Sequence, residues 1–113
     1  MTAPIIDAAT FAELQASAGA DFVKELVDTF REEAPTMLAE LKRALAVGQA
    51  EPFRRAAHSL KSNANTFGAL ALGAMARELE VGGLDAGRQP AALQRLDEAY
   101  QRAVAALSEP GDG

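Results

Sequence analysis

The chain contains a single histidine, and the residues around it suit phosphoryl chemistry. His58 follows Arg54 and Arg55 and precedes Lys61 by less than one helical turn. A neutral imidazole nitrogen is a nucleophile. An ordinary histidine has a pKa of about 6.5, so a large fraction of such side chains is neutral at the pH of the cytoplasm. The neighbouring cations disfavour the imidazolium and can balance the charge of an incoming anion. These residue types therefore predict a nucleophilic histidine that accepts a small anionic group.

The helical pattern around His58 places it on a polar face. Apolar side chains recur with the repeat of about 3.6 residues that is typical of a helix, at Phe53, Ala56, Ala57, Leu60, Ala64 and Phe67. His58 lies about 100° around the helix from Ala57 and shares its face with Arg54, Arg55, Lys61, Ser62 and Asn65. The alternative is an ordinary surface histidine. The short side chains of Ser62 and Asn65 favour the reactive interpretation, because they leave room for another protein to reach the ring.

The same periodicity predicts an all-α protein. It indicates helices at Asp7 to about Ser17, Asp21 to Gly48, Pro52 to Gly68, Leu70 to Gly82-Gly83, and Pro90 to Leu107. We expect Phe22 and Leu70 to face the core, and Pro35 to kink or divide the second helix. Short connections predict an antiparallel up-down four-helix bundle with a short additional N-terminal helix. Residues 1–108 would form this domain, and residues 109–113 a frayed tail.

Composition excludes several functional classes. The 113 residues suffice for one modest core, and the absence of cysteine excludes disulfides, thiolate metal sites and a catalytic thiol. A net charge of −5 argues against nonspecific binding of nucleic acid or anionic membranes. The N-terminus lacks the features of a signal peptide, and no apolar run reaches the roughly 18 residues that cross a bilayer. We expect a soluble cytoplasmic protein, and Met1 and the tail favour a free-standing one over a piece of a larger kinase.

The residues around His58 also resemble a known signature. The run His58-Ser59-Leu60-Lys61, followed by small residues and Gly68-Ala69, is similar to the motif of histidine-containing phosphotransfer (HPt) domains. The resemblance is strongest from Ala56 to Glu80, and the helix order extends it over nearly the whole chain. It implies a bundle that relays a phosphoryl group between His58 and the aspartate of response-regulator receiver domains. Ser62 departs from the pattern: the family usually has glycine there, so the closest approach of the receiver would be slightly more crowded.

The resemblance implies roles for the neighbouring residues. Lys61 would stabilise the phosphoryl charge, and the receiver-docking surface would comprise Arg54, Arg55, Ser62, Asn65 and Arg77. In the chemotaxis kinases of the family, a carboxylate at the position of Glu80 accepts a bond from the second ring nitrogen and fixes the tautomer. The alternative for Glu80 is an exposed glutamate near a helix end, and both interpretations stay open. For Gly68 we expect a structural role, as a positive-φ helix stop.

The expected partners are a response-regulator receiver domain, a hybrid sensor histidine kinase, or both. The chain has no glycine-rich phosphate loop and no complete metal-ligand set. We therefore expect no ATP binding, no autokinase activity and no cofactor, with magnesium held by the partner receiver. The expected form is a monomer that binds neither nucleic acid nor membranes. Two alternatives are a helical adaptor that never carries phosphate, and a receiver-binding protein of the same kind that lacks turnover.

Overall fold

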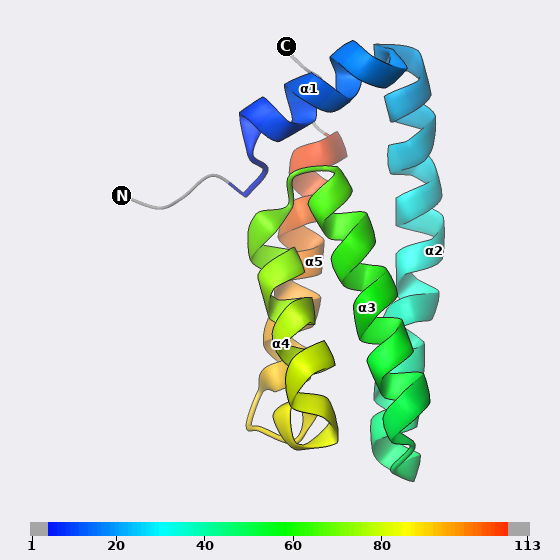
Figure 1. Cartoon of the computed structure of the whole chain (residues 1–113), viewed down its shortest axis with the longest axis vertical. Helices are drawn as coiled ribbons and strands as arrows, with labels where there is room; N and C mark the ends of the chain where they lie inside the picture. Colours follow the sequence, from blue (N-terminus) through cyan, green and yellow to red (C-terminus); the bar gives the residue numbers. More distant parts are fainter. Residues whose placement is uncertain (1–4, 109–113) are drawn as a thin grey trace.

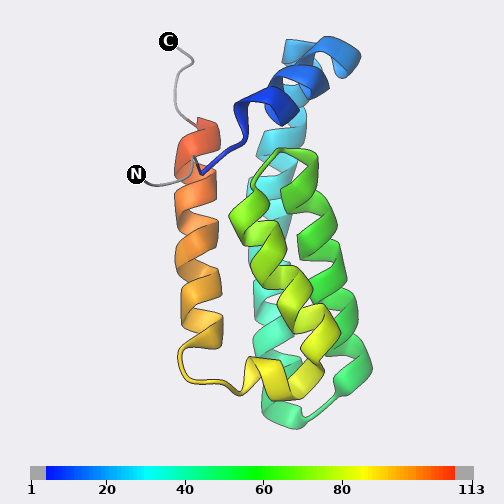
Figure 2. The same ribbon diagram turned by 60° about the vertical axis from the view of Figure 1, so that its left-hand side comes forward.

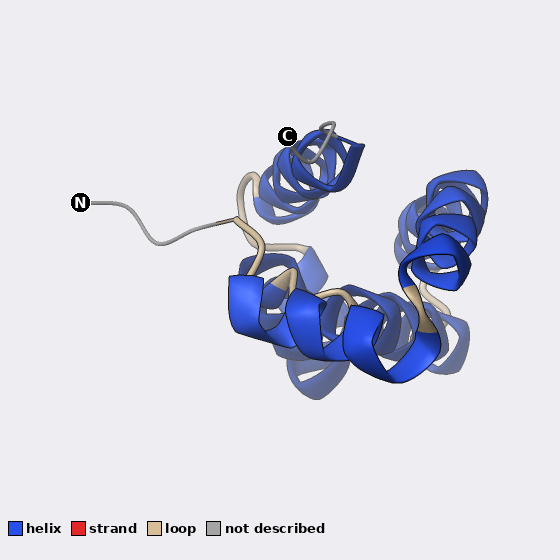
Figure 3. Cartoon of the chain, turned by 90° about the horizontal axis from the view of Figure 1, so that it is seen from above, coloured by secondary structure: helices blue, strands red, loops and turns tan. Residues whose placement is uncertain are grey.

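The computed structural model describes residues 5–108, and all regular secondary structure in that range is helical (Figure 1). The helices are α1 (Ala8–Ala18), α2 (Ala20–Val47), α3 (Ala50–Thr66), α4 (Leu70–Gly87) and α5 (Ala92–Ser108). Helices α2 to α5 run up and down side by side (Figure 2). Helix α1 lies across one end of this bundle (Figure 3). The predicted all-α bundle with an additional N-terminal helix is confirmed. The predicted tail, residues 109–113, lies outside the described residues.

One shared core is formed by a single face of each long helix. Helix α3 contributes the apolar positions expected from its periodicity, and both Phe53 and Leu60 have no exposed surface. The expectation for Phe22 and Leu70 was wrong, because they are 52% and 49% exposed. The first turns of α2 extend beyond the ends of α3 and α4 (Figure 1), so only the side of Val23 is covered there. Leu70 is the first residue of α4, two positions before the buried Leu72.

Helix α2 continues through Pro35 as one helix, so Pro35 does not divide it. A proline inside a helix lacks the N–H that would bond to the carbonyl four residues earlier, here that of Arg31. The Tyr100 hydroxyl of α5 donates a long hydrogen bond of 3.5 Å to this carbonyl. Helix α5 thus partly satisfies the acceptor that the proline frees.

The predicted helix boundaries are approximate. Gly83 has a φ of 66° and a ψ of −153°, which are not helical. The regular part of α4 therefore ends at the predicted pair Gly82-Gly83. One further turn carries the element to Gly87. Helix α5 begins at Ala92 instead of Pro90, because Ala91 adopts a positive φ of 62°.

The turn between α3 and α4 holds the N-terminal segment. Gly68 has a φ of 82°, the positive value expected of a glycine stop. Its carbonyl accepts a 2.8 Å hydrogen bond from the Asp7 N–H, just before α1. Asp7 in turn caps α1, since its carboxylate accepts a 3.0 Å bond from the Thr10 N–H. The carboxylate also accepts a 2.6 Å bond from the Thr10 hydroxyl, and this bond, followed by the cap bond, lowers the pKa of Asp7. The turn therefore joins α1 to the most closely packed helix pair, α3 and α4.

Candidate functional site

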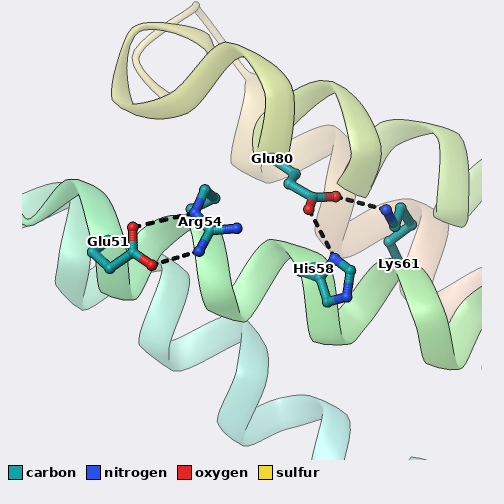
Figure 4. Close-up of polar contacts among 5 residues, drawn as sticks. All are labelled: Glu51, Arg54, His58, Lys61 and Glu80. Atoms are coloured by element: carbon teal, nitrogen blue, oxygen red, sulfur yellow. Dashed lines mark hydrogen bonds and ion pairs between the residues drawn. The ribbon is translucent and has the colours of Figure 1, made fainter.

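Helix α3 presents His58 to solvent, with 54% of its side chain exposed. Its Nδ1 lies 2.8 Å from Oε2 of Glu80, which reaches across from α4 (Figure 4). An ionised carboxylate only accepts hydrogen bonds, so Nδ1 is the nitrogen that carries the proton in this contact. In the neutral ring the lone pair is then on Nε2, the nitrogen that faces away from Glu80 (Figure 4). The geometry leaves one ring nitrogen available as a nucleophile.

The Glu80 carboxylate also contacts a second residue of α3. Its Oε1 is buried, and the Lys61 ammonium lies 2.8 Å from it (Figure 4). Lys61 therefore supplies the opposite charge next to this buried oxygen. Contact with Lys61 and, second, with His58 lowers the pKa of Glu80, although desolvation opposes the shift. One ionised carboxylate therefore links His58 and Lys61, a contact that sequence reasoning did not predict for Lys61.

A close approach between α3 and α4 brings these residues together. A Cβ atom at Gly73 would lie 2.0 Å from Oδ1 of Asn65, so the Asn65 side chain occupies the space that glycine leaves. The buried Leu60 and Leu79 precede Lys61 and Glu80 in their helices, so both polar side chains begin next to core positions. Sequence reasoning missed Gly73. An isolated glycine inside a helical pattern was the available signal, because it often marks close packing.

Arg54 lies one turn before His58 and is held by its own helix. Its Nε donates a 3.2 Å hydrogen bond to Oε1 of Glu51, and a second bond joins the same two side chains (Figure 4). This bonding raises the pKa of Arg54, with a smaller contribution from the charge of Glu80. Arg54 therefore belongs to the polar face of His58, but Glu51 already engages its guanidinium.

The other residues predicted for docking are exposed but differently directed. Arg55 lines an open groove between α2 and α3, on the flank away from α4, together with Met37 and Ser59. Asn65 leans on Gly73, as described above, and Ser62 is exposed on α3. Arg77 is exposed on α4 one turn before Glu80. The structure thus brings Glu80 into direct contact with both His58 and Lys61 and spreads the docking candidates around them.

Two further features bear on the class of site. Across residues 5–108, no group of three or more histidine, aspartate or glutamate side chains is arranged to hold a metal ion. None of the helices in the same range is long and apolar enough to span a bilayer.

Comparisons with known proteins agree with this geometry. The sequence model of the Hpt domain matches residues 25–108. No curated protein matches the chain significantly. Among solved structures, the chain is similar to histidine-containing phosphotransfer protein B (HptB) from Pseudomonas aeruginosa PAO1, with 29% identity and a TM-score of 0.74. That match covers 94% of this chain and 90% of the other. The domain match spans most of the chain and includes the exposed histidine and its carboxylate partner, so the chain belongs to the Hpt domain family.

Proposed function

We propose that this protein relays a phosphoryl group between Nε2 of His58 and the aspartate of a response-regulator receiver domain. The observation that carries the proposal is the 2.8 Å contact between Nδ1 of an exposed histidine and a partly buried carboxylate. In the neutral ring, this contact leaves Nε2 without a proton and open to a partner. Membership of the Hpt family and the similarity to a protein named for histidine phosphotransfer support the same function.

Each bond that forms in the proposed transfer is matched by one that breaks, and the resulting charge lies next to a residue of opposite charge. The Nε2 lone pair attacks the phosphorus of the receiver's aspartyl phosphate, an N–P bond forms, and the P–O bond to aspartate breaks. The aspartate carboxylate leaves with the bonding electron pair. The phosphorylated ring keeps its proton on Nδ1 and carries a positive charge beside Glu80, which stabilises it. The reverse reaction returns the phosphoryl group by the same route.

Glu80 would orient the ring, and Lys61 would act in two ways. The Lys61 ammonium keeps Glu80 ionised and in place, and it lies one turn from His58, within reach of a phosphoryl group on the ring. Lys61→Ala should slow transfer in both directions by about 10- to 100-fold. Glu80→Gln can still accept the Nδ1 hydrogen bond through its amide oxygen, whereas Glu80→Ala cannot. Nitrogen NMR of the ring in both variants would measure the tautomer directly.

The partners follow from this chemistry. A receiver domain would dock over His58 on a surface formed by Arg54, Arg55, Ser62, Asn65 and Arg77. The receiver would supply magnesium and the acidic pocket, while this chain would contribute no ATP site and no autokinase activity. We propose a monomeric cytoplasmic carrier that receives its phosphoryl group from a receiver or a hybrid kinase.

The test is phosphoryl labelling of the wild-type chain and of His58→Gln. Phosphoramidate serves as a small-molecule donor, and receiver domains phosphorylated with labelled acetyl phosphate serve as protein donors. The wild type should gain acid-labile, alkali-stable label, and His58→Gln should fold normally and gain none. Ser59→Ala is the matched control, because Ser59 is an exposed neighbour on the other flank of α3. Label on His58→Gln would refute the assignment of the acceptor. Binding of receivers without any labelling of the wild type would favour the helical adaptor or the receiver-binding protein that lacks turnover.

A further inference from the structure

We propose that the Ser62 hydroxyl donates a hydrogen bond to the phosphoryl group on His58, and so favours retention of that group on this chain. The inference rests on the proposed function and deepens it. It assigns a direct contact to Ser62, the residue at which the sequence departs from the resemblance to HPt domains.

The helix places Ser62 on the same face as His58. Ser62 lies four residues after His58 on α3, a spacing that puts two side chains on the same face with Cβ atoms about 5–6 Å apart. Both residues are exposed. Because Glu80 occupies Nδ1, the phosphoryl group is attached to Nε2, on the solvent side of the ring (Figure 4). On our proposal, the phosphoryl oxygens come within reach of the Ser62 side chain, which lies on the same face of α3.

Within the described residues, the Ser62 hydroxyl makes no hydrogen bond, whereas the side chains of neighbouring polar residues on α3 do. Serine and threonine inside a helix commonly bond to the carbonyl four residues earlier. Thr66 does so, donating a 2.9 Å bond to the Ser62 carbonyl, and the Asn63 amide donates a 2.8 Å bond to the Ser59 carbonyl. In the described part of the chain, no hydrogen bond uses the hydroxyl of Ser62. Its donor is therefore free for a group that arrives from outside.

Two of the cationic side chains near His58 on α3 already have partners, while Arg55 lies in the groove on the flank of α3 away from α4. Lys61 pairs with Glu80 at 2.8 Å, and Arg54 is bonded to Glu51. A phosphoryl group brings three terminal oxygens that accept hydrogen bonds. Ser62 can donate to one of them without breaking any existing contact, whereas Lys61 or Arg54 must loosen an ion pair first.

The bond exists only while the phosphoryl group is on His58, so it stabilises the phosphorylated state alone. A hydrogen bond to a charged, exposed acceptor should shift the transfer equilibrium toward this chain by about threefold to tenfold. It should also favour the fully ionised phosphoryl group, because hydrogen bonding to a charged form favours that form.

The experiment compares Ser62→Ala, Ser62→Gly and Ser62→Thr with the wild type after phosphorylation by phosphoramidate. Phosphorus NMR follows the pH at which the phosphoryl group loses its last proton. Mixing each labelled protein with one receiver domain gives the equilibrium distribution of label. The Ala and Gly variants should both raise that ionisation pH and move label toward the receiver by about threefold to tenfold. Ser62→Thr retains the hydroxyl and should stay close to the wild type, as should the control Ser59→Ala.

Three results would overturn the inference. If Ser62→Ala matches the wild type and only Ser62→Gly differs, the side chain acts by its bulk and the hydroxyl has no role. If no donor labels the wild type at all, the proposed function fails and the inference fails with it. A wild type that is labelled normally while Ser62→Ala keeps its ionisation and equilibrium would refute the inference alone.

Discussion

Gly68→Ala tests how the turn between α3 and α4 supports the fold. The residue has a φ of 82°, so an alanine there must adopt a left-handed conformation. A Cβ atom would also lie 2.9 Å from the backbone oxygen of Asp7 and 3.2 Å from Cβ of Thr10. A backbone oxygen cannot rotate away as a flexible side chain can. The segment that begins α1 would therefore have to shift.

The expected loss of stability has two parts. The left-handed conformation costs a residue with a Cβ about 1–2 kcal/mol, and overpacking against a fixed neighbour costs about 1–3 kcal/mol. Gly68→Ala should therefore lower the free energy of unfolding by about 2–5 kcal/mol. Gly48→Ala is the matched control, because Gly48 has a similar φ of 75° but no atom within 4 Å of the new Cβ. The control should show only the conformational cost, about 1–2 kcal/mol.

The assay is urea unfolding of both variants followed by circular dichroism, with amide hydrogen exchange as a local probe. Exchange of the Asp7 amide should speed up in Gly68→Ala alone, because its hydrogen bond to the Gly68 carbonyl is disturbed. The two variants share the same effect of alanine on the unfolded chain, so their difference reports the clash. Equal losses in Gly68→Ala and Gly48→Ala would refute the proposed contact between the turn and α1.

Three further predictions concern the core, the proline in α2 and acid stability. Leu60→Ala should cost about 2–5 kcal/mol in urea unfolding, because Leu60 is fully buried; a cost near zero would contradict the packing. Tyr100→Phe should cost about 0.5–1.5 kcal/mol, near the lower value because its bond to the Arg31 carbonyl is long, and no loss would show that solvent satisfies this carbonyl. The lowered pKa of Glu80 means that its carboxylate stabilises the fold above the usual value of 4.5, and that this contribution is lost as the pH falls through the lower folded value. Glu80→Gln should therefore reduce the acid dependence of the urea midpoint below pH 4.5, and an unchanged dependence would contradict the contact.

The helices were predictable because their information is local. A repeat of about 3.6 residues identifies a buried face wherever an entire helix packs on a core. It fails at Phe22, since the first turns of α2 extend past α3 and α4 and have few neighbours to cover them (Figure 1). The repeat also predicts a start of α5 that is too early. The positive φ of Ala91 sets this boundary, and the hydrophobic pattern does not indicate a backbone conformation.

Part of the site was likewise predictable from local sequence, and part depends on how the helices pack. His58 and Lys61 lie on one helix, so their spacing alone puts them on a shared face. Glu80 belongs to another helix, and its distance from His58 depends on how closely α3 and α4 approach. That approach is set by a turn at Gly68 and by the missing side chain at Gly73, neither of which periodicity describes.

The contact between Lys61 and Glu80 depends wholly on this tertiary packing, and it changes how the site is understood. A lysine on an exposed helix face would be expected to remain solvated and to meet the phosphoryl group directly. Packing against α4 instead buries Oε1 of Glu80, and a buried carboxylate oxygen needs a compensating charge. Lys61 supplies that charge, so the carboxylate can stay ionised and hold the His58 ring. In the proposed transfer, the orientation of the exposed ring nitrogen therefore depends on an ion pair formed on the opposite, inner side of the ring.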